Sequence, residues 1–341
     1  MRVRRIYCIL MMLPLLSSVA VVSTSFDRYV YASDGESITV HFIDVGQGDS
    51  IFIDTSGLDV LVDGGSRTAG DTVVEYLNNL SVVKIDLVVA THMDADHIGG
   101  LIAVLSSTIQ VDEVPTNDQT HDSKTYEDFM ALAKTHPVKA AQRGDTYILT
   151  QNVNLTILNP VQPLEFDDQN ENSVAMRLQI GGSSFLLMGD TEASAESSIL
   201  QSGLEIDSDV LKVGHHGSRY STTEAFLNAV SPSIAVISAG EDNQFGHPHQ
   251  ETLDKLLGRG INVYATYQSG TIVMSANSTS MEILNEPTPI PELSLLILTC
   301  LMFAISIGAI YKKRARAVER SGFCTSCRRL KSKYENKIAL R

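Results

Sequence analysis

Four side chains that can bind a divalent metal lie within six residues of this 341-residue sequence: His92, Asp94, Asp96 and His97. They directly follow an apolar, β-branched run that ends at Ala90, so we expect them on a loop at the end of a strand. Imidazole and carboxylate groups are ligands of divalent transition metals, and alternating residues on a short loop can serve two neighbouring ions. We expect His92 and Asp94 to face one ion, and Asp96 and His97 to face the other. A solvated polar turn is the alternative, but this density of ligand types favours metal binding.

Five more candidates follow later apolar runs: Asp190, His215, His216, His247 and His249. A carboxylate at the end of a strand can bridge two cations with its two oxygens, and we expect this role for Asp190. For His215 and His216 we expect metal-binding or proton-transfer roles, because functional residues gather on loops at the ends of scaffold elements. His247 would complete the second metal site or contact substrate, whereas His249 would begin a helix and be structural.

The elements that would position these residues alternate between short strands and helices over residues 38 to 285. We expect strands at 40–43, 51–53, 60–62, 85–90, 155–158, 176–180, 185–188, 210–213, 234–237, 263–266 and 271–275. We expect helices at 72–80, 192–201, 223–230 and 250–257, and a Gly-Gly turn at 99–100. Strand-rich halves with helices between them favour two sheets with helices on their outer faces.

The acidic and basic residues are segregated along the chain. Residues 33–291 contain 11 Lys and Arg against 36 Asp and Glu, a net charge of −25. Residues 312–341 contain 11 Lys and Arg against two Glu, a net charge of +9. Such a partition is typical of segments in different surroundings. The acidic part lacks the basic surface of a tight nucleic-acid binder, which argues against strong binding of DNA.

Two apolar segments predict export and a membrane anchor. Three arginines precede the apolar stretch 6–22, as in a secretory signal, and a small-x-small cleavage site follows. An uncleaved signal anchor is the alternative for residues 1–32. The stretch 293–311 carries no charge, is long enough to cross a membrane, and precedes the basic tail. We therefore expect a single-pass protein of the cell membrane with an external domain at 33–286, a Pro-rich stalk at 287–292 and a cytoplasmic tail at 312–341.

An ordered set of motifs in this sequence resembles the ComEC-type branch of the metallo-β-lactamase superfamily. The motifs are Phe42–Ser50, Val62–Gly65, His92–His97, Asn170–Ser173, Gly189–Asp190, His215–Ser218 and Gly246–His249. The resemblance implies an α+β fold, a four-layer αββα sandwich with the site at one edge, in which Asp63 is a structural aspartate. It also implies a metal-dependent hydrolase that cuts phosphodiesters, including DNA. The family's membrane channel and small β-domain are not among these 341 residues.

The resemblance and the ligand types together predict a hydrolase with two divalent metal ions, Zn²⁺ or alternatively Mn²⁺. A hydroxide shared by the ions would attack phosphorus or a carbonyl carbon. We assign catalytic roles to Asp96, His216 and His247, with the two histidines as candidate proton donors. The predicted metal ligands are His92, Asp94, Asp96, His97, Asp190, His215 and His216. Without metal, the three aspartates of this set should repel one another.

Three functions are compatible with these features. The leading hypothesis is an exported, membrane-anchored phosphodiesterase, with nuclease activity as one form of it. The acidic domain favours the second, a metallo-esterase that acts on a cell-surface ester, lactone or phosphorylcholine-type group, because a negative field repels a polyanion. The third, a non-catalytic surface binding module, does not require the full ligand set that is present.

Overall fold

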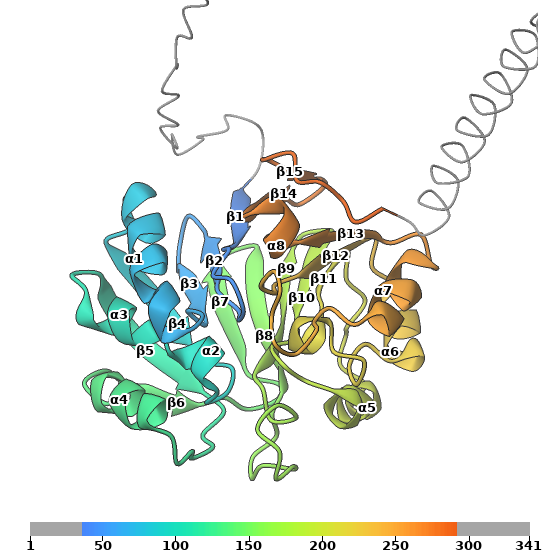
Figure 1. The fold of residues 1–341 in the computed structure, drawn as a ribbon. Helices are drawn as coiled ribbons and strands as arrows, with labels where there is room; N and C mark the ends of the chain where they lie inside the picture. The colour runs from blue at the N-terminus through green and yellow to red at the C-terminus, as the bar shows by residue number, and fades with distance from the viewer. Residues whose placement is uncertain (1–35, 292–341) are drawn as a thin grey trace, which may run out of the picture.

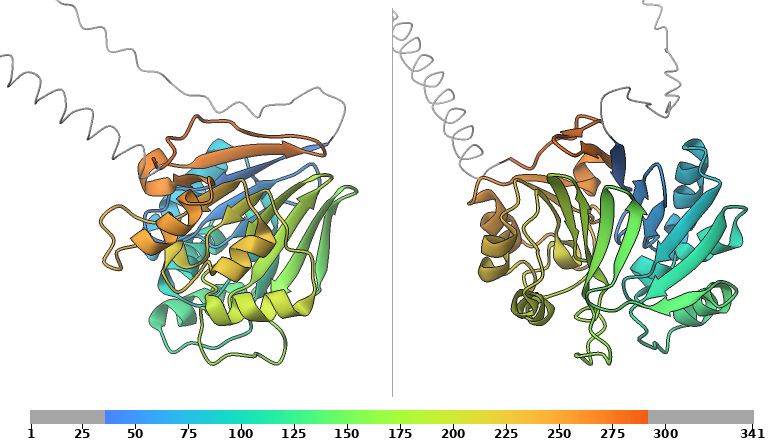
Figure 2. Two further views of the ribbon diagram at one scale, coloured as in Figure 1. Left: turned by 90° about the vertical axis from the view of Figure 1, so that its right-hand side faces the viewer. Right: turned by 180° about the vertical axis from the view of Figure 1, so that it is seen from behind.

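The computed structural model describes residues 36–291, which fold into two β-sheets packed face to face (Figure 1 and Figure 2). The strand order of the first sheet is β15-β14-β1-β2-β3-β4-β5-β6. Its strands are β1 (Ser37–Phe42), β2 (Ile51–Asp54), β3 (Val60–Val62), β4 (Lys84–Val89), β5 (Gln110–Thr116), β6 (Val138–Ala140), β14 (Ile272–Asn277) and β15 (Met281–Ile283). The second sheet has the order β13-β12-β11-β10-β9-β8-β7. Its strands are β7 (Thr146–Thr150), β8 (Val153–Asn159), β9 (Ala175–Ile180), β10 (Ser183–Leu187), β11 (Val210–Lys212), β12 (Ile234–Ile237) and β13 (Asn262–Ala265).

Helices cover the outer face of each sheet, so the described chain has four layers (Figure 1). On the first sheet these are α1 (Gly70–Asn79), α2 (Ala95–Ile98), α3 (Leu101–Ser106) and α4 (Lys124–Ala133). On the second they are α5 (Ala193–Ser202), α6 (Glu224–Val230) and α7 (Gln250–Leu257). Three short turns complete the structure: α8 (Thr266–Ser269) and the 3₁₀ turns η1 (Arg67–Ala69) and η2 (Gly214–Gly217). The expected four-layer αββα arrangement is confirmed.

Alternating side chains of the strands divide the apolar interior into three cores. On β2, Ile51 and Ile53 lie in the core between the sheets, whereas Phe52 lies in the core beneath the outer helices. On β10, Phe185 points to the central core and Leu186 to the helices of the second sheet. Successive residues of a strand face opposite sides of its sheet, and here both sides are buried. The strands are therefore held on both faces, which fixes the positions of the loops at their ends.

The strands and helices predicted near the motif residues are confirmed to within a few residues, but the loop expected at His92–His97 is interrupted, because Asp96 and His97 lie on α2. Five elements between residues 101 and 154 are not predicted by the sequence. These are α3, β5, α4, β6 and β7. Pro115 lies inside β5, where a proline argues against a strand. β6 and β7 are mostly exposed or half-buried, so they lack the continuous apolar run of the other strands.

The predicted turn at Gly99 and Gly100 is confirmed, and it lies between two helices. Both residues have helical dihedrals, φ −58° and ψ −46° for Gly99 and φ −74° and ψ −25° for Gly100, and they join α2 to α3. Glycine is required at position 100 for space, because a Cβ there would lie 1.8 Å from the carbonyl oxygen of Gly64. The close approach presses the α2–α3 corner against the loop that follows β3.

The predicted signal at 1–32 and membrane span at 293–311 lie outside the described residues. Within residues 36–291, none of the helices has the length and apolarity needed to cross a membrane. The part of the predicted stalk that is described lies along the domain. The N–H of Ile290 donates to the carbonyl of Val263 at 2.7 Å, and the Ser269 hydroxyl donates to the carbonyl of Thr288 at 3.2 Å.

Candidate metal centre

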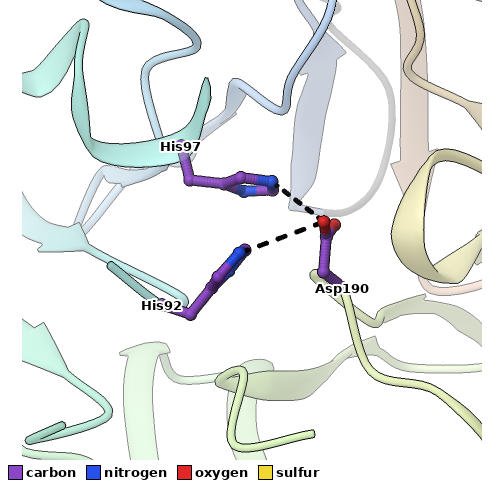
Figure 3. A group of neighbouring side chains, drawn as sticks. All are labelled: His92, His97 and Asp190. Atoms are coloured by element: carbon purple, nitrogen blue, oxygen red, sulfur yellow. Dashed lines mark ion pairs between the residues drawn. The ribbon is translucent and has the colours of Figure 1, made fainter. Parts of the chain in front are cut away.

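The predicted ligands meet at the edge of the sandwich where strands from both sheets end (Figure 3). In the first sheet, β4 leads into α2, and this segment carries His92, Asp94, Asp96 and His97. In the second sheet, β10 is followed by Asp190, and β11 by η2 with His215 and His216. β10 and β11 are parallel neighbours, so their carboxyl ends lie at the same edge. The cluster therefore forms only when the two sheets are packed together.

Three ligand atoms form a triangle with equal edges at the centre of the cluster. The Nε2 atoms of His97 and His216 lie 3.3 Å apart, and each lies 3.3 Å from Oδ2 of Asp190. Oδ2 of Asp96 lies 3.6 Å from Nε2 of His216. A cation near the centre of this triangle can lie about 2 Å from all three atoms, which matches zinc–nitrogen and zinc–oxygen bond lengths. We call Asp96, His97 and His216, with the shared Asp190, the inner group, and its geometry fits one cation.

Hydrogen-bond partners at Nδ1 fix the orientation of both inner imidazoles. Nδ1 of His97 lies 2.8 Å from a carboxylate oxygen of Asp63, and Nδ1 of His216 lies 2.9 Å from the carbonyl oxygen of Ser238. In the neutral rings Nδ1 carries the proton, so both Nε2 lone pairs point at each other across 3.3 Å. Two facing lone pairs repel unless a proton or a cation lies between them. Asp63 thus has the structural role that the resemblance implies.

A buried ion pair between Asp49 and Lys212 also contacts Nδ1 of His216. Oδ1 of Asp49 lies 3.3 Å from Nδ1 of His216, and its Oδ2 lies 2.8 Å from the ammonium group of Lys212. Asp49 and Lys212 are both buried. The loop that carries Asp49 reaches this position because Gly48, at φ +122°, has no side chain; a Cβ there would lie 2.0 Å from the carbonyl oxygen of Asp96. This loop is the tight turn near the site that the motif Phe42–Ser50 contains.

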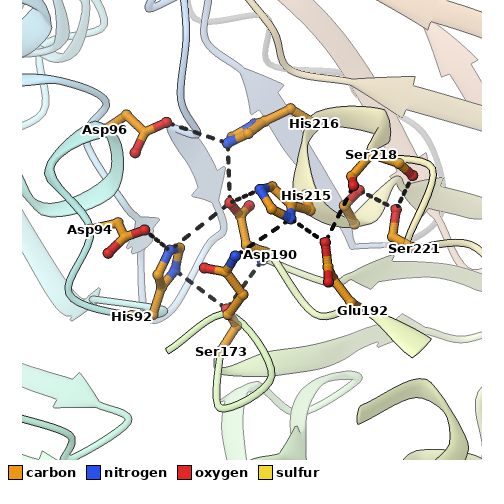
Figure 4. Close-up of polar contacts among 12 residues, drawn as sticks. His92, Asp94, Asp96, Ser173, Asp190, Glu192, His215, His216, Ser218 and Ser221 are labelled. Carbon is orange, nitrogen blue, oxygen red and sulfur yellow. Dashed lines mark hydrogen bonds and ion pairs between the residues drawn. The ribbon is translucent and has the colours of Figure 1, made fainter. Parts of the chain in front are cut away.

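The remaining predicted ligands form a wider and more exposed set, which we call the outer group: His92, Asp94 and His215, again with Asp190 (Figure 4). Nε2 of His92 lies 3.7 Å from Oδ2 of Asp94 and 3.9 Å from Oδ2 of Asp190. Nε2 of His215 lies 3.7 Å from the same Asp190 oxygen. The side chain of Asp94 is 41% exposed and that of His215 is 22% exposed, whereas His92 is fully buried.

Two buried atoms of the predicted ligands lack a hydrogen-bond partner. They are Nε2 of His92 and Oδ1 of Asp190. The Ser173 hydroxyl contacts Nδ1 of His92 at 3.3 Å and accepts the N–H of Asp190 at 3.2 Å, so it positions both residues. Buried polar atoms are normally hydrogen-bonded, and a bound cation is one explanation for an exception. The donor set therefore fits a second cation that shares Asp190.

The electrostatics of the inner group show a carboxylate held between imidazoles. Burial alone would raise the pKa of Asp190, but His216 and His97 beside it hold that pKa well below its usual range. Burial likewise opposes protonation of His216, yet Asp190 and Asp49 raise its pKa to about 10. The pKa of Asp94 is lowered, first by its contact with His92. The expected repulsion among the aspartates is thus outweighed by the histidines.

The structure brings all the predicted site residues to this edge, but with different surroundings. The half-buried His247 ring lies 5.1 Å from the ring of His215 and 6.2 Å from that of His216. His249 is the N-cap residue of α7, and its Nδ1 accepts the N–H of Arg219 at 3.1 Å. It is therefore a structural residue at the start of a helix, as expected.

Four residues of this region have no predicted role in the site: Asp49, Lys212, Glu192 and His121. Oε1 of Glu192 lies 2.7 Å from Nδ1 of His215, and Nε2 of His121 lies 3.8 Å from Oδ1 of Asp94. A sequence signal exists only for Lys212, because a lysine inside an otherwise apolar strand indicates a buried ion pair. The other contacts depend on residues that are distant in sequence.

Comparison with known families agrees with this geometry. Residues 43–241 match the family described as the metallo-beta-lactamase superfamily. The chain belongs to that superfamily. It is 32% identical over 262 residues to ComE operon protein 3 of Bacillus subtilis (strain 168), which covers 71% of this chain and 33% of that protein. It is also 32% identical over 232 residues to competence protein ComA of Neisseria gonorrhoeae, which covers 67% of this chain and 31% of that protein.

The predicted resemblance to ComEC-type proteins is therefore confirmed, although the chain spans about a third of the length of these curated relatives. Solved structures are more distant. The metallo-beta-lactamase fold protein YhfI from Bacillus subtilis is 16% identical with a TM-score of 0.42, covering 73% of this chain and 100% of that chain. A diphosphatase from the PhnP family is 15% identical with a TM-score of 0.42, covering 73% of this chain and 99% of that chain. The protein is a member of the metallo-β-lactamase superfamily whose His and Asp side chains include groups that can hold metal ions.

Proposed function

We propose that the protein is a metal-dependent phosphodiesterase with two cations that share Asp190. The observation that carries this proposal is the 3.3 Å triangle of His97, His216 and Asp190, joined through Asp190 to the wider outer group. Two cations close together, when bound, polarise a phosphoryl oxygen, lower the pKa of water and neutralise the charge that develops in an in-line displacement. The protein supplies the fixed ligands. Zn²⁺ fits the inner group, and Mn²⁺ is the alternative because three carboxylates are present.

We assign His92, Asp94 and Asp190 to the second cation and leave His215 out of its ligand set, because His215 is the best-placed proton carrier for the leaving group. Its Nδ1 is held 2.7 Å from the carboxylate of Glu192, and its Nε2 points toward Asp190. Its pKa is raised: burial opposes protonation, but Glu192 and Asp190 favour it. This arrangement moves the predicted donor role from His216, which is buried between Ser238 and the inner group.

The backbone of η2 supports this division of roles. His215 and His216 are consecutive residues with positive φ, +46° and +53°, a conformation that costs on the order of 1–3 kcal/mol for a non-glycine residue. The turn directs His216 into the inner group and His215 toward solvent and Glu192. His247 has a pKa lowered to about 4, first by burial, and so contributes a neutral ring beside His215.

The proposal is tested with the purified full chain. After chelation and reloading with Zn²⁺ or Mn²⁺, we expect two ions per chain and hydrolysis of bis-p-nitrophenyl phosphate that is lost on chelation. His249→Ala is the matched control, since that ring lies in the same region but only begins α7. Hydrolysis of p-nitrophenyl acetate without hydrolysis of the diester would favour the esterase alternative. Failure to bind metal would contradict both.

We also propose that the domain is exported and anchored by the segment 293–311. Support comes from the charge-free stretch itself and from the change of net charge from −25 to +9 across it. Protease added to intact cells should remove the domain and leave a small membrane-bound remnant that ends at Arg341. Full protection of the domain would contradict this topology.

A further inference from the structure

We propose that the ring of Phe245 is a stacking surface for the nucleobase of a short substrate, a nucleoside phosphodiester of one or two nucleotides rather than a polymer. This inference rests on the proposed phosphodiesterase function and narrows its substrate class. Two independent observations support it. Aromatic rings are exposed beside the site, and nearly all basic side chains of the domain bind groups of the domain itself.

Phe245 lies at the rim of the metal centre. Its side chain is 51% exposed, and its ring is stacked on that of His247, with centroids 5.8 Å apart and an interplanar angle of 24°. His247 in turn lies 5.1 Å from the ring of His215. The Phe245 ring is therefore no more than about 11 Å from the His215 ring, the sum of the two centroid distances. A nucleoside can place its base and its phosphate across such a span.

The loop that presents Phe245 is held in place by its own hydrogen bonds. The side-chain oxygen of Asn243 accepts the N–H groups of Phe245 at 3.1 Å and of His247 at 3.0 Å. The side-chain nitrogen of Asn243 donates to the carbonyl of Gly240 at 2.8 Å. The ring is thus preset in its exposed position, which lowers the entropy cost of binding a flat partner.

A second exposed ring lies on the neighbouring loop. Tyr220 is 65% exposed, and its carbonyl accepts the N–H of Ala193, next to Glu192. Phe245 and Tyr220 are the two large aromatic side chains that are exposed among residues 36–291. Both lie on loops that carry site histidines. Single exposed apolar residues need no explanation, but their concentration at this edge points to recognition of a ring.

The basic side chains argue against a polymer. Of the eleven Lys and Arg residues in 36–291, ten already bind carboxylates, carbonyls or other side chains of the domain. These ten are Arg67, Lys84, Lys124, Lys139, Arg143, Arg177, Lys212, Arg219, Lys255 and Arg259. The eleventh, Lys134, is the C-cap of α4. A nucleic-acid polymer needs cations along its backbone, whereas a single phosphate needs only the metal centre.

The decisive substitution replaces the ring while keeping apolar bulk. In Phe245→Leu, we expect the KM for a dinucleoside monophosphate to rise roughly tenfold relative to the KM for a ringless glycerophosphodiester, with kcat little changed. Phe245→Trp should keep the preference, because its ring can stack. Ile148→Ser is the matched control, since Ile148 is 60% exposed on β7, outside the metal centre. Equal changes for both substrates would overturn the inference and leave the proposed function intact.

A binding measurement separates the two proposals. The quenching of a dinucleotide that contains 2-aminopurine reports stacking without turnover. If the wild type quenches it and Phe245→Leu does not, the inference holds even when no diester is hydrolysed and the proposed function has failed. Absence of quenching by the wild type would overturn the inference, and so would binding of a 20-nucleotide single strand more than about tenfold tighter than the dinucleotide.

Discussion

The inner and outer groups share Asp190 but differ in how closely their ligand atoms approach one another and in how exposed they are. In the inner group both imidazoles have fixed partners behind them, Asp63 for His97 and Ser238 for His216, and the ligand triangle has 3.3 Å edges. In the outer group the corresponding distances are 3.7–3.9 Å, and Asp94 is 41% exposed. The difference indicates that the inner position is formed before a cation binds. The outer position is the more exposed of the two.

The substitution Asp190→Asn should have the largest effect, because it removes the atom that both groups share. An amide has the same shape but no charge, so we expect both ions to be lost and turnover to fall by more than about a hundredfold. In the metal-free protein the melting temperature should also fall, because His97 and His216 lose the anion between them. Turnover near that of the wild type would refute a shared carboxylate.

Asp94→Ala tests whether the two groups can be separated. This side chain contacts His92 and His121 but belongs only to the outer group. We expect elemental analysis to show one ion per chain instead of two, with the inner ion retained. Loss of both ions would mean that the inner and outer groups form a single cooperative site.

Asp63→Asn removes the carboxylate that orients His97 but leaves every proposed metal ligand in place. Asparagine tolerates the φ of +56° at this position, and its oxygen can still accept the N–H of Thr91, but the amide nitrogen then faces Nδ1–H of His97 and cannot accept it. We expect the affinity of the inner ion to fall about 10- to 100-fold, the usual range for such partners. Competition with a chelator measures it. Ser173→Ala is the matching change behind His92 and should affect the outer ion instead.

A buried histidine elsewhere provides the contrast to His216. His41 contacts Thr39 and Tyr76, and burial lowers its pKa to about 4. Between pH 4 and 6.5 the unfolded chain binds a proton that the folded chain does not, so the free energy of unfolding rises with pH across this window. The difference amounts to at most roughly 3 kcal/mol. In urea unfolding at pH 5 and pH 7, His41→Gln should lose this part of the pH dependence; an unchanged dependence would contradict it.

The parts of the fold that could be predicted are those with strong local patterns. Strands such as β4 and β10 are buried on both faces, and the ligand motifs directly follow them. The strands and the motifs were therefore predicted from the sequence. The segment from α3 to β7 was not, because Pro115 interrupts β5 and β7 is largely exposed. The turn at Gly99 and Gly100 was predicted, but the close contact with Gly64 that requires glycine at position 100 is not revealed by any local pattern.

The same limit applies to the site. His92 to His97 could be found because four ligand types lie together in the chain. Asp49 and Lys212 could not be assigned a role, since they meet across 163 positions of sequence and act through His216. Glu192 lies two residues from Asp190, yet its partner is His215 on the next loop. Residues that orient ligands are recognised by their contacts, and those become visible only in the folded chain.

Because the ligands come from both sheets, metal binding also affects the stability of the folded protein. Neither sheet alone holds a complete inner group, because His97 comes from the first and His216 from the second. A cation bound there resists separation of the sheets, and at a hundredfold excess over its dissociation constant it adds about 2.7 kcal/mol to the folded state. A chain that lacks metal would open more often and be degraded faster, so metal scarcity would lower the amount of enzyme as well as its activity.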